Sequence, residues 1–306
     1  MHNKPINIDI CIATFKRAAL LAKLLQSIAG QKLDGNIVPK LIIVDNDRLA
    51  SARETVESIR ANYPFPIVYD LEPEQNIALA RNRCLSHTGG DIIVFVDDDE
   101  FVEENWLGDL IKTLLDFNAD VVLGPVLPVF DEKAPGWIIR GGFLERPRFR
   151  TGTIRNSGAA GNAAVKRFVF SEFEQPFDPS YGLSGGEDHD FFDKIIRKGG
   201  KLVWCDSAIA HEHVPASRLT VKFLVLRAFR GGQSFSSIAL KKLPIWRRFI
   251  WFSHRILLSL IALLLVVLSV FSGKVLFVKA LEKLFANIGQ LSAFTRYRYK
   301  EYAASG

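Results

Sequence analysis

Three consecutive carboxylates directly after a short apolar run constrain this chain more than any other feature. The segment IIVFVDDDE occupies residues 92–100 and joins five apolar residues to Asp97, Asp98 and Asp99. A run that is this short, this apolar and rich in β-branched residues predicts a strand buried on both faces of a parallel sheet. Burying unpaired carboxylates is costly. The acids are therefore expected at the carboxyl end of the strand, where open α/β sheets place their ligands.

Carboxylate oxygens fixed side by side are the ligands that Mg²⁺ or Mn²⁺ prefers, and such ions are commonly shared with substrate phosphates. A solvated acidic turn that merely ends a strand would have the same local sequence. The three acids alone leave both interpretations open.

The segments around the acidic strand alternate between strand and helix patterns. Strands are expected at 6–14, 40–44, 67–71, 120–129 and 201–205, and helices at 18–29, 51–61, 76–85 and 107–115, with a helix start within 183–192. This order predicts an α/β fold with a doubly wound, mostly parallel sheet and helices on both faces. The second strand runs into Asp45, so two strand ends would line one crevice of nucleotide size. Neither GxGxxG nor GxxxxGK[ST] occurs, so phosphates would be held by metal and arginine.

Acids and histidines follow later in the chain. Glu187 and Asp188 stand behind two glycines at an expected helix start, where acids can simply satisfy free N–H groups and the helix dipole. His211 and His213 lie two apart in an extended segment, so both face the same side. One of them is a candidate metal ligand, and a structural role is the alternative.

The 306 residues carry a net charge of +6, and the excess of positive charge falls mostly after Ser217. A basic, apolar C-terminal third indicates an anionic membrane surface, and no nucleic-acid motif accompanies it. Cys11, Cys84 and Cys205 show neither metal nor disulfide spacing, which favours buried thiols in a reducing cytosol. The N-terminus lacks the apolar segment of a secretory signal.

Residues 256–272 are 17 uncharged residues, at the lower limit for a membrane-spanning helix. Positive charge flanks the run on both sides, which disfavours a single crossing. We therefore expect a helix that dips into the bilayer, or a short hairpin that returns both ends to the cytoplasm. A true span and a buried core helix are the alternatives. On this basis residues 236–306 are predicted to form a basic, membrane-associating helical region.

The motifs together resemble family-2 glycosyltransferases. The matching segments, within residues 6–235, are IATFKR, IIVDN, QNIALARN, VFVDDDE, AGNAAV, GGEDHDF and HEHVPASR. Their order and spacing carry the resemblance, because each motif alone is weak. HEHVPASR followed by RAFRGGQS is similar to bacterial exopolysaccharide glucosyltransferases of the succinoglycan type.

The resemblance implies a GT-A domain over residues 1–235 that inverts the anomeric centre of a nucleotide sugar. A hexose such as glucose would pass from a UDP-sugar to a hydroxyl of a glycan or lipid-linked acceptor, at the cytoplasmic face of the bacterial inner membrane. Asp188 resembles the catalytic base, and Asp99 with His211 or His213 would hold Mg²⁺ or Mn²⁺. Donor binding would fall to Thr14, Arg17, Asp45 with Arg81 nearby, Asp97 and Asp98. Because this chain has DDD where the family has DxD, the acids that contact the metal are left open.

Two other functions share some of these features. A metal-dependent nucleotidyltransferase would use metal and nucleotide but release pyrophosphate, and a non-catalytic membrane-anchored α/β scaffold would use neither. Neither alternative explains Glu187 and Asp188 behind a double glycine. A glycosidase would need a close pair of carboxylates flanking the scissile bond.

Overall fold

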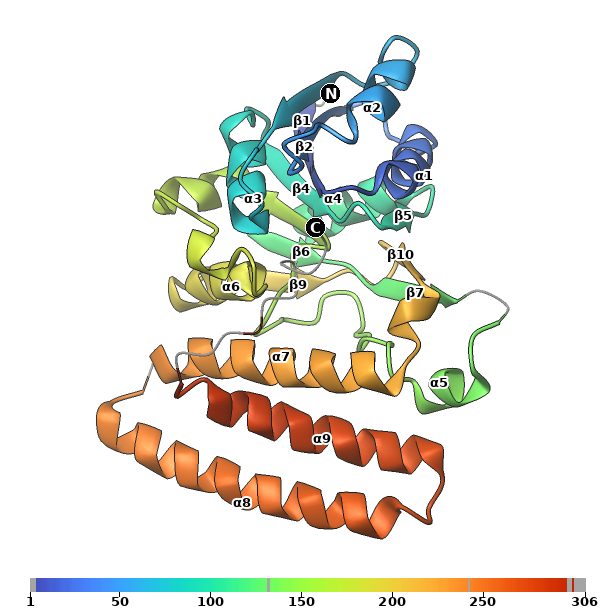
Figure 1. Ribbon diagram of the computed structural model, residues 1–306. Helices are drawn as coiled ribbons and strands as arrows, with labels where there is room; N and C mark the ends of the chain where they lie inside the picture. Colours follow the sequence, from blue (N-terminus) through green and yellow to red (C-terminus); the bar gives the residue numbers. More distant parts are fainter. Residues whose placement is uncertain (1–3, 131–132, 242, 296–298, 300–306) are drawn as a thin grey trace. The chain divides into compact units, whose positions relative to one another are not determined.

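The computed structural model describes residues 4–130, 133–241, 243–295 and 299 (Figure 1). The chain forms two compact units. The first contains Met1–Leu127 and Arg146–His213, and the second contains Pro128–Glu145 and Val214–Gly306.

A seven-stranded sheet forms the centre of the first unit, in the order β3-β2-β1-β4-β8-β6-β9. Its strands are β1 (Ile6–Thr14), β2 (Ile37–Asp45), β3 (Ile67–Leu71), β4 (Ile92–Val96), β6 (Val121–Leu123), β8 (Asn162–Lys166) and β9 (Leu202–Trp204). Strands β3, β2, β1 and β4 are parallel neighbours, β6 is parallel to β9, and β8 lies antiparallel between β4 and β6. The predicted α/β class with a mostly parallel sheet is confirmed.

Helices cover both faces of this sheet because successive side chains of a strand point to opposite faces. Ile10 and Val94 pack among residues of α1 (Ala18–Ala29), α2 (Arg53–Arg60) and α4 (Trp106–Asp116). Their strand neighbours Cys11 and Phe95 pack among residues of α3 (Ile77–Ser86) and α6 (Glu187–Arg197). All three cysteines are buried, as the sequence predicts for Cys11 and Cys205.

The strand expected at 120–129 is instead two short strands in different sheets. After β6, the chain passes Gly124 and Pro125 and continues as β7 (Val126–Phe130) in a small sheet of order β5-β10-β7. The other strands of that sheet are β5 (Glu100–Val102) and β10 (Ala210–Val214). Pro125 has no N–H for a ladder. A Cβ on Gly124 would overlap the carbonyl of Ala208 and the amide of Asn162, so only glycine fits this crossing.

The helix expected to start within 183–192 begins at Glu187, because Gly185 and Gly186 have φ angles of 74° and 100°. These values lie in the left-handed region that favours glycine. Short 3₁₀ helices run over Arg167–Glu172, Pro179–Tyr181 and Ala216–Arg218.

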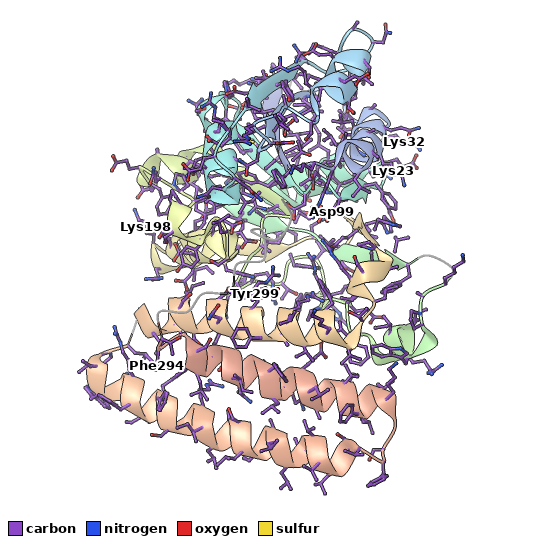
Figure 2. The ribbon with its side chains drawn as sticks, viewed as in Figure 1. Lys23, Lys32, Asp99, Lys198, Phe294 and Tyr299 are labelled. Atoms are coloured by element: carbon purple, nitrogen blue, oxygen red, sulfur yellow. The ribbon has the colours of Figure 1, made fainter. Side chains whose placement is uncertain are left out.

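The second unit contains α5 (Gly136–Gly141), α7 (Val221–Lys241), α8 (Ile245–Ser269) and α9 (Lys274–Ser292). Helix α9 packs against both α7 and α8. A Cβ on Gly232 would overlap the carbonyl of Ala286, and one on Gly289 would overlap that of Phe229, so α7 and α9 approach closely. Phe294, labelled in Figure 2, packs its ring 5.9 Å from Trp251 and 4.9 Å from Phe252 of α8.

Helix α8 is the one described helix that is long and apolar enough to cross a membrane, with a mean hydropathy of 2.2 in its most apolar window. It covers most of the apolar helix predicted at 256–272, but it begins 11 residues earlier, at Ile245, and ends three residues earlier, at Ser269. The predicted division at residue 235 lies inside α7, whereas the compact units divide before Val214. Positions 242, 296–298 and 300–306 of the predicted C-terminal region lie outside the described residues.

Candidate active site

Hydrogen bonds connect the acidic turn after β4, residues 97–99, to the loop that follows β1. The Thr14 hydroxyl donates to Asp98 Oδ2 at 2.8 Å, and Arg17 Nη1 donates to Asp98 Oδ1 and Asp99 Oδ2, both at 2.9 Å. Burial raises the pKa of Asp98 to about 6, although the nearby Arg17 cation opposes the shift. The structure therefore brings together Thr14, Arg17, Asp98 and Asp99, which the sequence assigned to one site.

Asp45 lies at the end of β2 in an internal network. Its Oδ2 accepts from the Ala52 backbone N–H at 2.7 Å and from the Tyr69 hydroxyl at 2.9 Å, and its Oδ1 accepts from the Asp47 N–H at 3.0 Å. The side chain is fully buried. These bonds fix the turn that leads from β2 to α2, so Asp45 shapes this end of the sheet.

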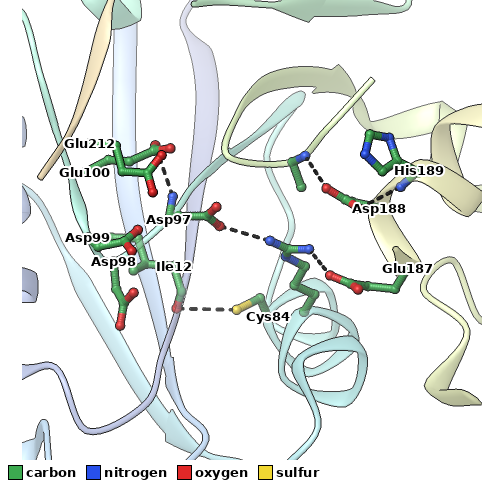
Figure 3. Close-up of polar contacts among 12 residues, drawn as sticks. Ile12, Cys84, Asp97, Asp98, Asp99, Glu100, Glu187, Asp188, His189 and Glu212 are labelled. Atoms are coloured by element: carbon green, nitrogen blue, oxygen red, sulfur yellow. Dashed lines mark hydrogen bonds and ion pairs between the residues drawn. The ribbon is translucent and has the colours of Figure 1, made fainter. Parts of the chain in front are cut away.

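Arg81 lies between two carboxylates from distant parts of the chain. Its Nη2 donates to Asp97 Oδ1 at 2.9 Å, and its Nη1 donates to Glu187 Oε1 (Figure 3). The structure therefore places Arg81 between Asp97 and Glu187. Helix α3 thereby connects the acidic turn to the start of α6.

Asp188 follows Glu187 in the first turn of α6. Its carboxylate accepts from the Ala160 N–H at 3.3 Å and from the His189 N–H at 2.7 Å. Burial alone would raise the pKa of Asp188, but His189, Arg81 and the two backbone N–H groups outweigh it and hold the pKa below its usual value. Asp188 is therefore ionised at neutral pH.

Glu187 is a residue that sequence reasoning treated only as a helix cap. Burial raises its pKa to about 7, opposed by Arg81 and reinforced by Asp188. Its Oε2 is buried and has no hydrogen-bond partner among the described residues. Adjacent carboxyl groups whose pKa values are shifted in opposite directions are typical of acid–base sites. The only feature of the sequence that marks Glu187 is the pair of glycines directly before it.

The two histidines differ in their surroundings. The His211 ring stacks on Phe101 with centroids 5.0 Å apart, and its Nε2 lies 3.1 Å from Glu103 Oε1. The His213 N–H donates to the Asp99 carbonyl at 3.3 Å. Pairing of β10 with β5 thus brings the backbone of His213 to the acidic turn.

Glu100 is a second residue that the sequence analysis did not assign. It is buried, and burial, followed by the charge of Asp97, raises its pKa well above the usual value. A Cβ on Gly161 would lie 2.8 Å from Glu100 Oε1 and 3.0 Å from Asp97 Oδ2. The glycine of the AGNAAV motif therefore makes room for these carboxylates. In the sequence, only its position directly after the three aspartates marks Glu100.

In the part of the chain that the structure describes, no three His, Cys, Asp or Glu side chains gather as a metal centre. Asp99 nevertheless supplies hard carboxylate oxygen atoms, and His213 is bound to it through the backbone, because the His213 N–H donates to the Asp99 carbonyl. Mg²⁺ is commonly held by one or two protein groups together with substrate phosphates. The donors therefore fit a divalent ion that takes its remaining ligands from a diphosphate.

Comparison with known sequences decides the family. The sequence model of glycosyl transferase family 2 matches residues 9–173. The chain belongs to glycosyltransferase family 2. It is 38% identical over 243 residues to the succinoglycan biosynthesis protein ExoM of Rhizobium meliloti, covering 79% of this chain and 78% of that protein. It is also 31% identical over 122 residues to the abequosyltransferase RfbV of Salmonella typhimurium, covering 38% of this chain and 34% of that protein.

Solved glycosyltransferases share the fold. S. aureus TarS 1–349 in complex with UDP has a TM-score of 0.55 at 15% identity, covering 96% of this chain and 93% of that chain. GalNAc-T7 with UDP, GalNAc and Mn²⁺ has a TM-score of 0.56 at 14% identity, covering 80% of this chain and 52% of that chain. The expected glycosyltransferase activity and GT-A type of fold are confirmed.

Proposed function

We propose that this family-2 glycosyltransferase transfers a hexose, such as glucose, from a UDP-sugar to a hydroxyl of a glycan or lipid-linked acceptor in exopolysaccharide synthesis. The name of the succinoglycan biosynthesis relative supports the pathway class. The solved TarS complexes with UDP and UDP-GlcNAc support a uridine nucleotide donor.

One observation carries the mechanism. The ionised carboxylate of Asp188 stands apart from the acidic turn and is joined to it through Glu187, Arg81 and Asp97. A single base separated from a diphosphate site suits a direct displacement, in which the acceptor attacks the anomeric carbon from the face opposite the leaving group. The product would have the inverted configuration.

In this mechanism Asp188 removes the proton of the acceptor hydroxyl as the oxygen attacks. Thr14, Arg17, Asp45, Arg81, Asp97 and Asp98 form or shape the donor side of the site. Asp99 would hold Mg²⁺ or Mn²⁺ together with His211 or His213, and the His213 N–H donates to the Asp99 carbonyl at 3.3 Å. The bound ion would supply Lewis-acid neutralisation of the diphosphate charge.

A donor screen by mass spectrometry tests this proposal. The purified protein would be incubated with a panel of nucleotide sugars and a glycan acceptor, with magnesium or manganese present. Release of UDP with a glycosylated product of inverted configuration supports the proposal. Release of pyrophosphate would indicate a nucleotidyltransferase, and absence of both products would indicate a scaffold.

The C-terminal region, residues 236–306, would hold the enzyme at the cytoplasmic face of the inner membrane. Helix α8 exposes apolar side chains over much of its length, and α9 follows after a short connection and packs against it. Such a pair is consistent with a hairpin that returns to the side from which it entered. A C-terminal reporter that is active only in the cytoplasm would support the hairpin, and an external signal would indicate a span.

A further inference from the structure

Helix α3 is attached to the segment that precedes α6. The Asn82 side chain donates to the Phe177 carbonyl at 2.7 Å and accepts from the Phe177 N–H at 3.1 Å. The Asn76 side chain donates to the Pro179 carbonyl at 3.1 Å. These uncharged bonds fix the backbone that leads to the base, and they leave the first turn of α6 to other contacts.

Arg81 makes a contact of a different kind from the same helix. Arg81 is 7% exposed, and its guanidinium connects Asp97, at the end of β4, with Glu187, the first residue of α6. The planar fork of an arginine can orient two carboxylates at once, which the point charge of a lysine cannot do. Arg81 thus fixes the distance between Asp97, on the side of the sugar donor, and the residue next to Asp188.

We propose that Arg81 is a positioning residue that couples the acidic turn to Asp188 through Asp97 and Glu187. It orients the first turn of α6, and its positive charge keeps Asp188 ionised. This inference rests on the proposed function, in which Asp188 is the base. It differs from the direct donor contact that the family resemblance implies for Arg81.

Loss of the guanidinium has two physical consequences. Glu187 loses its charged partner while its Oε2 already lacks one, so the buried carboxyl favours its protonated form. Asp188 loses the guanidinium that helps to lower its pKa and keeps the backbone N–H groups of Ala160 and His189, while burial still favours its neutral form. The pKa of Asp188 should therefore rise, and its oxygen atoms should move from the acceptor.

Arg81→Met tests the coupling through kcat and KM measured across pH and UDP binding measured by calorimetry. We expect kcat to fall about 100-fold, the size typical of misplacement by about 1 Å. The acidic limb of the kcat profile should move to higher pH because Asp188 loses a nearby cation, and UDP affinity should stay within about 3-fold. Arg81→Lys retains a cation without the fork, so it should restore the acidic limb but only part of kcat.

Two variants on the same helix serve as matched controls. Arg83→Met removes a half-exposed arginine that pairs with Asp70, and it should keep wild-type kcat and pH profile. Asn82→Ala removes the uncharged attachment to Phe177, so it should lower the melting temperature without moving the acidic limb.

An Arg81→Met protein that loses UDP affinity 10-fold or more with an unmoved acidic limb would overturn the coupling and make Arg81 a donor-binding residue. A profile matching Asn82→Ala would overturn it in favour of a purely structural role. If Arg81→Met does not fold, Arg81→Lys decides, since an unmoved kcat there contradicts a need for the fork. Full turnover in Asp188→Asn would contradict the proposed function itself, whatever Arg81 does.

Discussion

The two compact units handle charge and apolar surface in opposite ways. In the first unit the apolar side chains are inside, and buried carboxylates such as Asp98 and Glu187 are held near arginines at one end of the sheet. In the second unit α8 leaves Leu260 and Leu264 about 60% exposed, at 60% and 58%. Small polar contacts, such as Gln233 to Ser292 at 2.9 Å, lie between its helices.

This difference fits the proposed attachment of the second unit to a membrane. A sheet that buries its apolar faces and gathers charge at one end is built for water and a charged ligand. A helix with a continuous exposed apolar surface is unusual for a protein surrounded by water alone and marks an interaction site. Changes in one unit should therefore affect catalysis, and changes in the other should affect membrane attachment.

The largest effect is expected from Asp188→Asn in the first unit. Turnover should fall at least about 1,000-fold because the variant cannot accept the acceptor proton, while UDP binding should change little. Kinetics and calorimetry measure the two quantities, and membrane attachment should be unchanged. Asp193→Asn, on the same helix and paired with Arg197, is the control and should retain turnover. Loss of both UDP binding and folding would instead support a helix-capping role.

Asp99→Ala should reduce turnover about 100-fold and weaken the metal-dependent part of UDP binding at the same time. The reason is that Asp99 is the proposed protein oxygen ligand of the ion. Titration of UDP with and without manganese measures the effect, and Asp116→Ala on the exposed surface of α4 is the control. Full activity of Asp99→Ala in the presence of EDTA would remove the metal from the mechanism.

The double change Leu260→Arg and Leu264→Arg should break attachment without breaking catalysis. An arginine at the centre of a membrane helix costs about 2.5–3.5 kcal/mol on insertion scales, so the membrane-bound fraction should fall several-fold. Fractionation of the full-length chain measures this, and turnover on a water-soluble acceptor should persist. Leu49→Arg, at a leucine of the first unit that is 77% exposed, should leave the fraction unchanged. A wild-type protein found entirely in the soluble fraction would contradict the membrane proposal.

Glu187→Gln should change the pH dependence of stability. Burial raises the pKa of Glu187 from 4.5 to about 7, so the folded state binds the proton more tightly than the unfolded state. The associated stability is present below about pH 4.5 and is lost as the pH rises through about 7. Between pH 5 and pH 8 the wild type should therefore lose stability relative to Glu187→Gln, by on the order of 2–3 kcal/mol at most.

Melting temperatures of both proteins at pH 5 and pH 8 measure this difference. Glu172→Gln is the control, because its exposed carboxyl has a pKa lowered by Lys198 and should not titrate in this interval. A constant difference between Glu187→Gln and the wild type across the interval would show that Glu187 does not titrate there.

Local pattern was sufficient for much of the fold. The nearly continuous burial of β1 and β2, the helix spacing of α1 and the acidic end of β4 follow from the hydrophobic pattern and from the cost of burying charge. The apolar character of α8 also follows directly from composition. These features depend on neighbours in the sequence, and the chain specifies them without reference to distant contacts.

Other features depended on which segments meet in space. Arg81 and Glu187 are 106 positions apart, and only packing of α3 against the segment before α6 brings them together. The internal bonds of Asp45 and the space left by Gly161 beside Glu100 depend on tertiary contacts in the same way. Periodicity tells which face of an element is buried, but the partner of a polar side chain is set by the three-dimensional register of elements far apart in the chain.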